Sequence, residues 1–342
     1  MRRSLIPAVT LALGGASLTG CGLLGGSSSL DDALEVVPSS VDRVIFFDRA
    51  AAVERLDIEE LEEDPSEEEL HSYLEEVREL PYFTELDSSL VQMLETAPFS
   101  AQDVEWEVAA YEGDDGFGRV WKMNDDLDLD DVADELVDAG FEEESGEGRT
   151  LSIDLEEIGE DERYLFSMQT VTLLRDDHLI VTGPLADDVL DVIADDADSA
   201  VDDDTFEDLV DSTDDVEVAQ MARDDKACQA IDRLSPEQLE ASGIDELGHP
   251  EETGFFVHGD KADVRSVLLF DDEDAAEEDA EAREEFLADG SSPVSGVPYE
   301  EFAEWEIDTD GDQERIDLDY DEPEVVSAVI SRGDFVSVCP PE

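Results

Sequence analysis

The sequence predicts an α+β protein that consists of two related halves built around a mostly antiparallel sheet. Apolar residues fall in short blocks, some with the two-residue period of strands and others with the 3.6-residue period of helices. Several strand-like blocks follow one another across short turn segments, which indicates hairpins and therefore antiparallel pairing. The order strand–helix, hairpin, helix, strands, helix occurs twice, over residues 36–196 and 205–342.

The elements of the first half follow from the spacing of its apolar residues. A strand at 41–48 leads into a helix at 50–56, and Ser66 with Glu69 forms a capping box that begins the next helix. Pro81 ends that helix, because proline cannot continue it. The other predicted elements are a helix at 88–96, a hairpin of strands 106–111 and 119–123, a helix after the acidic segment 125–131, strands at 149–153, 163–168, 170–174 and 178–182, and a helix at 184–194.

The second half repeats this order after an acidic linker at 195–204, which is typical of a solvated hinge. It begins with a strand at 216–222 and a helix at 226–234 that carries Cys228. The halves either form separate domains or share one sheet, since each is long enough for a core of its own. The other predicted elements are a hairpin of strands 254–258 and 264–270, a helix at 275–288, strands at 302–307 and 315–320, and a helix at 323–330.

The charge of the chain is extreme, with 19 basic against 99 acidic residues and a formal net charge of −80. Self-repulsion of this size destabilises a compact fold in dilute buffer, and molar salt removes most of it because the Debye length falls to about 3 Å. Intrinsic disorder is excluded because 41% of the residues are apolar and lie in periodic blocks. A nucleic-acid partner is also excluded, since no basic stripe could neutralise phosphates. The acidic, lysine-poor composition resembles that of proteins from halophiles, the haloarchaea first and halophilic actinobacteria second.

The N-terminus has the pattern of an export signal. Arg2 and Arg3 precede a short apolar stretch at 5–18, and Leu18-Thr19-Gly20-Cys21 resembles the lipobox of secreted lipoproteins. This resemblance implies a signal peptide at 1–20, a lipid on Cys21 and a flexible tether at 21–35; the alternative is an ordinary signal peptide. The paired arginines also resemble a twin-arginine signal, so both export routes stay open. No further apolar run of about 18 residues follows, which favours a protein anchored to the membrane rather than spanning it.

Cys228 and Cys339 remain as a pair once Cys21 is assigned to the lipid. An extracytoplasmic location favours a disulfide between them, which would close a loop of about 110 residues and add roughly 4 kcal/mol. The alternative is two free thiols. A zinc site is not predicted, because no CxxC motif occurs and no histidine is near either cysteine in the sequence.

One segment carries a candidate metal site. Asp308, Asp310 and Asp312 alternate around Gly311, as carboxylates do in part of a calcium loop. The flanking positions depart from that pattern, however, and a β-hairpin with Asp310-Gly311 at its turn is favoured. No catalytic residue and no cofactor are predicted: nucleophile-elbow, phosphate-loop and dinucleotide motifs are absent from the sequence, and 99 carboxylates hide any catalytic acid pair.

These observations predict a lipid-anchored extracytoplasmic protein that binds a small molecule or a protein partner and is not an enzyme. A cleft between the halves is the expected ligand site. The alternatives are a carboxylate-dependent cell-envelope hydrolase and a structural component of the envelope. The predicted location is the outer face of the cell membrane, with the lipid on Cys21 as the membrane contact. The mature region resembles no family of known activity.

Overall fold

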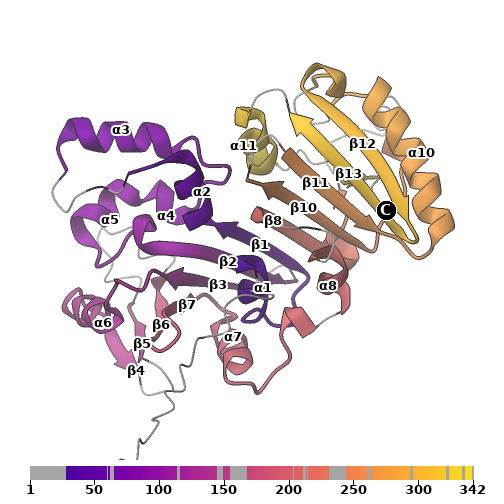
Figure 1. Ribbon diagram of the computed structural model, residues 1–342. Coiled ribbons are helices and arrows are strands. Elements are labelled where there is room, and N and C mark those ends of the chain that lie inside the picture. The colour runs from indigo at the N-terminus through magenta and orange to yellow at the C-terminus, as the bar shows by residue number, and fades with distance from the viewer. Residues whose placement is uncertain are drawn as a thin grey trace, which may run out of the picture.

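The computed structural model describes residues 28–340 except 60, 62–64, 114–115, 145–148, 155–167, 203, 211–212, 214, 231–243, 260–262, 293–295, 321–322 and 333–335. Within these residues, twelve strands form one sheet in the order β12-β13-β11-β10-β8-β1-β2-β3-β7-β6-β5-β4 (Figure 1). Every neighbouring pair in this sheet is antiparallel. The predicted α+β class is therefore confirmed.

The strands of this sheet are β1 Arg43–Asp48, β2 Val104–Glu112, β3 Gly116–Met123, β4 Glu142–Glu144, β5 Arg149–Ser152, β6 Thr170–Leu174, β7 Leu179–Thr182, β8 Val216–Arg223, β10 Glu252–His258, β11 Asp263–Leu269, β12 Ala303–Asp310 and β13 Gln313–Tyr320. A separate pair of short parallel strands consists of β9 Gln229–Ala230 and β14 Val338–Cys339. The helices are α1 Ser29–Leu34, α2 Arg49–Leu56, α3 Glu67–Val77, α4 Glu85–Ser88, α5 Leu90–Thr96, α6 Leu129–Asp138, α7 Ala186–Ile193, α8 Asp204–Val210, α10 Glu273–Asp289 and α11 Pro323–Arg332. Short 3-10 turns are η1 Ala101–Asp103, η3 Ala200–Asp202, η4 Asp224–Lys226, η5 Ile244–Glu246 and η6 Tyr299–Glu301.

The two halves meet at the centre of the sheet, where β1 pairs with β8. On each side of this pair the same order continues outward. First comes a hairpin, β2–β3 or β10–β11. A second hairpin, β6–β7 or β12–β13, then pairs with the first through the strand that comes later in the sequence, β7 or β13. Each central strand also has a helix just before it, α1 before β1 and α8 before β8, and both helices contact the strands that follow them. The related halves thus share one continuous sheet.

The sheet separates two cores, because successive side chains of a strand point to opposite faces. In β1, Phe47 faces one core and Phe46 the other, and both side chains are buried. Helices α2 to α6, α10 and α11 cover the Phe47 face, whereas α1, α7 and α8 cover the Phe46 face. Coverage on both faces fits the unbroken apolar run from Val44 to Phe47 in β1. Strand β8 is mixed, since Glu217 and Gln220 interrupt its apolar residues.

Helix α1 lies inside the segment 21–35 that the sequence predicts to be a tether. Ser28 begins it with a capping box that includes Asp31. Leu30 and Leu34 are only 2% and 1% exposed and pack into the Phe46 core. Residues 29–34 therefore belong to the folded domain.

Three other expectations differ from the structure. The helix predicted at 88–96 corresponds to α5, which begins two residues later at Leu90, and a separate short helix, α4, precedes it. The linker 195–204 is not a simple solvated hinge, since Ala200 is fully buried and Ser199 pairs with Pro38. Cys228 lies between η4 and β9 rather than on a helix, and within the predicted helix 226–234 the residues Gln229–Ala230 form β9 instead. Residues 231–234 lie outside the described residues. The predicted strand 163–168 also lies almost wholly outside them.

No helix in the part of the chain that the structure describes is both long and apolar enough to cross a bilayer.

Candidate functional site

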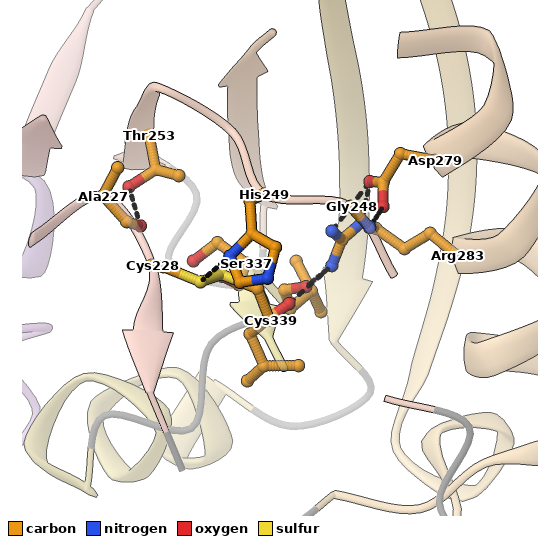
Figure 2. Close-up of a disulfide and its surroundings, with 11 residues drawn as sticks. Ala227, Cys228, Gly248, His249, Thr253, Asp279, Arg283, Ser337 and Cys339 are labelled. Carbon is orange, nitrogen blue, oxygen red and sulfur yellow. Dashed lines mark hydrogen bonds and ion pairs between the residues drawn. A yellow bond between two sulfur atoms is a disulfide. The ribbon is translucent and has the colours of Figure 1, made fainter. Parts of the chain in front are cut away.

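The cysteine pair forms the predicted disulfide. Cys339 belongs to β14, which lies parallel to β9, and Cys228 directly precedes β9. This pairing brings the two Cα atoms to 5.6 Å, within the range that a disulfide spans without movement of the backbone. The bond connects residues 111 positions apart and fixes the C-terminal segment to the second half of the fold (Figure 2).

A histidine lies against this disulfide. The Nδ1 atom of His249 is 3.5 Å from Sγ of Cys228, and Figure 2 shows its ring beside the sulfur pair. His249 is exposed, Cys228 is half-buried and Cys339 is buried, and one ligand atom from each lies within 4.8 Å of the other two. No histidine is near either cysteine in the sequence, but the fold brings His249 to the cysteine pair, because three separate segments of the chain meet here.

An ion pair on α10 holds two of these segments. Arg283 and Asp279 lie one turn apart, 2.7 Å from Nη2 to Oδ2, and neither side chain is exposed. Nη1 of Arg283 also donates to the carbonyl oxygens of Val336 and Val338, on the segment that leads to Cys339. Asp279 accepts from the backbone N–H of Gly248, next to His249 (Figure 2). Helix α10 therefore positions both the cysteine strand and the histidine loop.

Glu314 of β13 completes this buried group. Its Oε1 is 3.4 Å from Nε of Arg283. Burial raises the pKa of Glu314 to about 9; Arg283 acts in the opposite direction, and Asp279 raises it further. Burial also acts to raise the pKa of Asp279, but Arg283 and several hydrogen bonds outweigh it, and the pKa of Asp279 is lowered. At neutral pH the group thus consists of one arginine, one carboxylate and one protonated acid, with no net charge.

A cavity of about 380 Å³ lies elsewhere, between α2 and the start of β2. Val53, Ile58 and Tyr73 give it an apolar wall. Its full lining consists of Arg49, Ala50, Val53, Glu54, Asp57, Ile58, Tyr73, Gln102, Val104, Glu105 and Asn124.

The charge of this cavity is negative. Arg49 is the one basic residue among the described residues that line it, and its Nη1 lies 2.7 Å from Oδ1 of Asp87, where both side chains are buried. That pairing neutralises the arginine, whereas Glu54, Asp57 and Glu105 contribute three carboxylates to the lining. Burial raises the pKa of Glu105, against the effect of Lys122. Such a lining suits a ligand that is neutral or positively charged.

The three aspartates predicted as a candidate metal site, Asp308, Asp310 and Asp312, lie in a hairpin. Asp308 and Asp310 lie in β12 of a β12–β13 hairpin, and Gly311, at φ +66°, forms its turn with Asp312. Asp308 pairs with Arg315 at 3.0 Å, and the backbone oxygen of Asp312 accepts from Phe270. The favoured hairpin, with Asp310-Gly311 at its turn, is confirmed.

Two further expectations concern position. The described residues that line the cavity beside α2 all belong to the first half, whereas the sequence predicts a cleft between the halves. Cys21 lies outside the described residues.

Comparisons with known proteins give little. No family model and no curated protein matches the chain. Three solved crystal forms of a protein called TP0453 are similar to it. Form I has 11% sequence identity and a TM-score of 0.42, and the match covers 87% of this chain and 96% of that one. Form III has 12% identity and a TM-score of 0.43, with coverage of 87% and 97%, and form IV has 12% identity and a TM-score of 0.44, with coverage of 89% and 100%. At these values the similarity indicates neither a common family nor a common activity.

Proposed function

We propose that this chain is a lipid-anchored extracytoplasmic binding protein that holds a small neutral or cationic molecule in the cavity beside α2. The observation that carries this proposal is the cavity itself, since preformed hollows with an apolar wall and a few converging polar groups are the usual ligand sites of proteins. Gln102 and Asn124 supply neutral polar groups, and the carboxylates at 54, 57 and 105 supply negative charge.

The proposed location rests on two separate features. The Cys228–Cys339 disulfide fits an oxidising compartment, where such bonds persist. The lipobox-like segment that ends at Cys21, preceded by a basic and then an apolar stretch, supports export followed by lipid attachment. The tether that this requires extends at most to residue 28, because α1 begins at Ser29.

The ligand site is tested by filling the cavity from its rim. Ala50 is exposed and lines the cavity, so Ala50→Phe places a ring in the hollow with little disturbance of the core. Ala139→Phe, at an exposed position after α6, is the matched control. We expect small molecules released from protein purified in molar salt to include one stoichiometric compound, present with wild type and Ala139→Phe and lost with Ala50→Phe. A compound retained equally by all three variants would place the site elsewhere.

The anchor is tested independently. We expect Cys21→Ser to move the protein from the membrane fraction to the soluble fraction, with its fold unchanged by circular dichroism. If the variant stays in the membrane fraction through washes in high salt, the lipid is not what holds the protein there.

A further inference from the structure

We infer that the disulfide is one of two states of this site, and that in the reduced state Cys228, Cys339 and His249 bind one zinc-class divalent metal ion. This inference is independent of the cavity beside α2. It rests on the arrangement of the three side chains and on the contacts that hold their backbones.

The distances fit tetrahedral coordination. Zinc takes thiolate sulfur at about 2.3 Å and imidazole nitrogen at about 2.0–2.1 Å, so a sulfur and a nitrogen on one ion are separated by about 3.6 Å. Sγ of Cys228 and Nδ1 of His249 are 3.5 Å apart. Two thiolates on one ion are separated by about 3.8 Å, which the sulfurs can reach by side-chain rotation while the Cα atoms stay 5.6 Å apart.

The backbones that carry the ligands are held by contacts other than the disulfide. Arg283 binds the carbonyls of Val336 and Val338 before Cys339, and Asp279 binds the N–H of Gly248 before His249. The hydroxyl of Thr253 donates to the carbonyl of Ala227, which precedes Cys228, at 2.8 Å. Reduction of the bond therefore leaves three preorganised ligands, and preorganisation lowers the entropic cost of binding.

The redox step follows from exposure. Cys228 is the more accessible sulfur, so a thiolate of an external dithiol attacks it, and Cys339 leaves as a thiolate that takes up a proton. The second external thiol then displaces Cys228, so that one protein disulfide and one external dithiol become two protein thiols and one external disulfide. Metal binding to the two thiols and the neutral imidazole releases two protons. Because His249 is exposed, the fourth coordination position faces solvent and can take water.

The experiment uses the full mature chain in molar potassium chloride, with a phosphine as the reductant and Co²⁺ as the probe. We expect a sulfur-to-cobalt charge-transfer band that saturates at one Co²⁺ per chain in the reduced protein and is absent from the oxidised protein. Carboxylates that bind Co²⁺ give no such band, so the acidic surface does not interfere. His249→Ala should weaken Co²⁺ binding by at least about tenfold. Loss of a group that only hydrogen-bonds to a metal ligand already costs about that much, and His249 is proposed to bind the metal itself. His71→Ala, which removes an exposed histidine of α3, is the matched control and should change nothing.

Three results would overturn the inference. The first is no charge-transfer band in the reduced protein, and the second is an unchanged Co²⁺ affinity in His249→Ala. The third is loss of the fold on reduction, seen by circular dichroism before metal is added, because the ligands would then not be preorganised. Protection of both cysteines from alkylation by one equivalent of Zn²⁺, in a chain that stays folded, would support it.

Discussion

Glu314 provides the sharpest test of the electrostatics beneath the disulfide. Its side chain is fully buried beside Arg283 and Asp279, and burial is the main reason that its pKa is raised to about 9 from an ordinary value of 4.5. Between these two values the folded chain holds a proton on Glu314 that the unfolded chain has released. The unfolded state thus binds fewer protons, so the free energy of unfolding falls as pH rises, by about 1.4 kcal/mol per pH unit from this one group.

The substitution Glu314→Gln removes the contribution of this group to the pH dependence of the free energy of unfolding. The amide imitates the protonated acid and can still donate a hydrogen bond to Asp279, but it does not titrate. We expect the variant to match wild type near pH 5 and to be more stable by roughly 2–3 kcal/mol at pH 7, with the difference growing up to about pH 9. Titrating groups that do not interact with Glu314 cancel in this difference.

The assay is urea unfolding at constant molar salt from pH 5 to 9, with tryptophan fluorescence as the measure of unfolding. Glu306→Gln, at an exposed position of β12, is the control and should follow wild type at every pH. A stability difference between wild type and Glu314→Gln that does not change with pH would refute the assignment of a buried, protonated Glu314.

Three further predictions concern the whole fold. Replacing both Cys228 and Cys339 with serine should lower the free energy of unfolding by roughly 4–5 kcal/mol in the same urea assay, since the disulfide closes a loop of more than a hundred residues; an unchanged midpoint would mean that the bond does not form. Leu34→Ala should cost about 2–5 kcal/mol because this side chain is buried, whereas Glu35→Ala beside it should cost almost nothing; equal effects would mean that α1 is not part of the domain. Transfer from molar to about 0.1 M salt should unfold the chain by circular dichroism, since the Debye length grows from about 3 to about 10 Å; a melting temperature independent of salt would contradict the role given to self-repulsion.

Much of the fold could be predicted because local signals and tertiary structure agree. The alternation in β12 and β13, with Asp310-Gly311 between them, predicts a hairpin that the structure contains, and the capping box at Ser66 and Glu69 begins α3 where expected. The recurring element order also indicated two related halves. The central β1–β8 pairing could not be predicted, since antiparallel strands far apart in the sequence carry no local signal of their partner.

The elements that were missed have a common cause. Helix α1 follows a glycine- and serine-rich segment and is only 6 residues long, and α8 is an acidic helix of 7 residues. Each carries a single i, i+3, i+4 set of apolar residues, which is too short a pattern to predict a helix from the sequence. Both are stable because Leu34 and Leu209 are buried in the Phe46 core. Tertiary packing, rather than propensity, determines short helices of this kind.

The candidate sites were less predictable than the fold. The disulfide followed from an even number of remaining cysteines, but His249 gave no signal, because it is 21 positions from one cysteine and contacts it only through the β9–β14 pairing and the contacts of α10. The cavity beside α2 depends on how α2 and α3 lie against the first strands of the sheet, which no motif encodes. The large number of carboxylates also removes any local signal from those that line it.

The most direct test of the central claim is a native mass spectrum of the wild-type protein extracted from membranes of its source in molar salt. We predict a chain that begins at Cys21, carries a covalent lipid there, and retains one small neutral or cationic molecule that dissociates on activation. A chain with an unmodified N-terminus and no bound molecule would contradict both the anchor and the binding function.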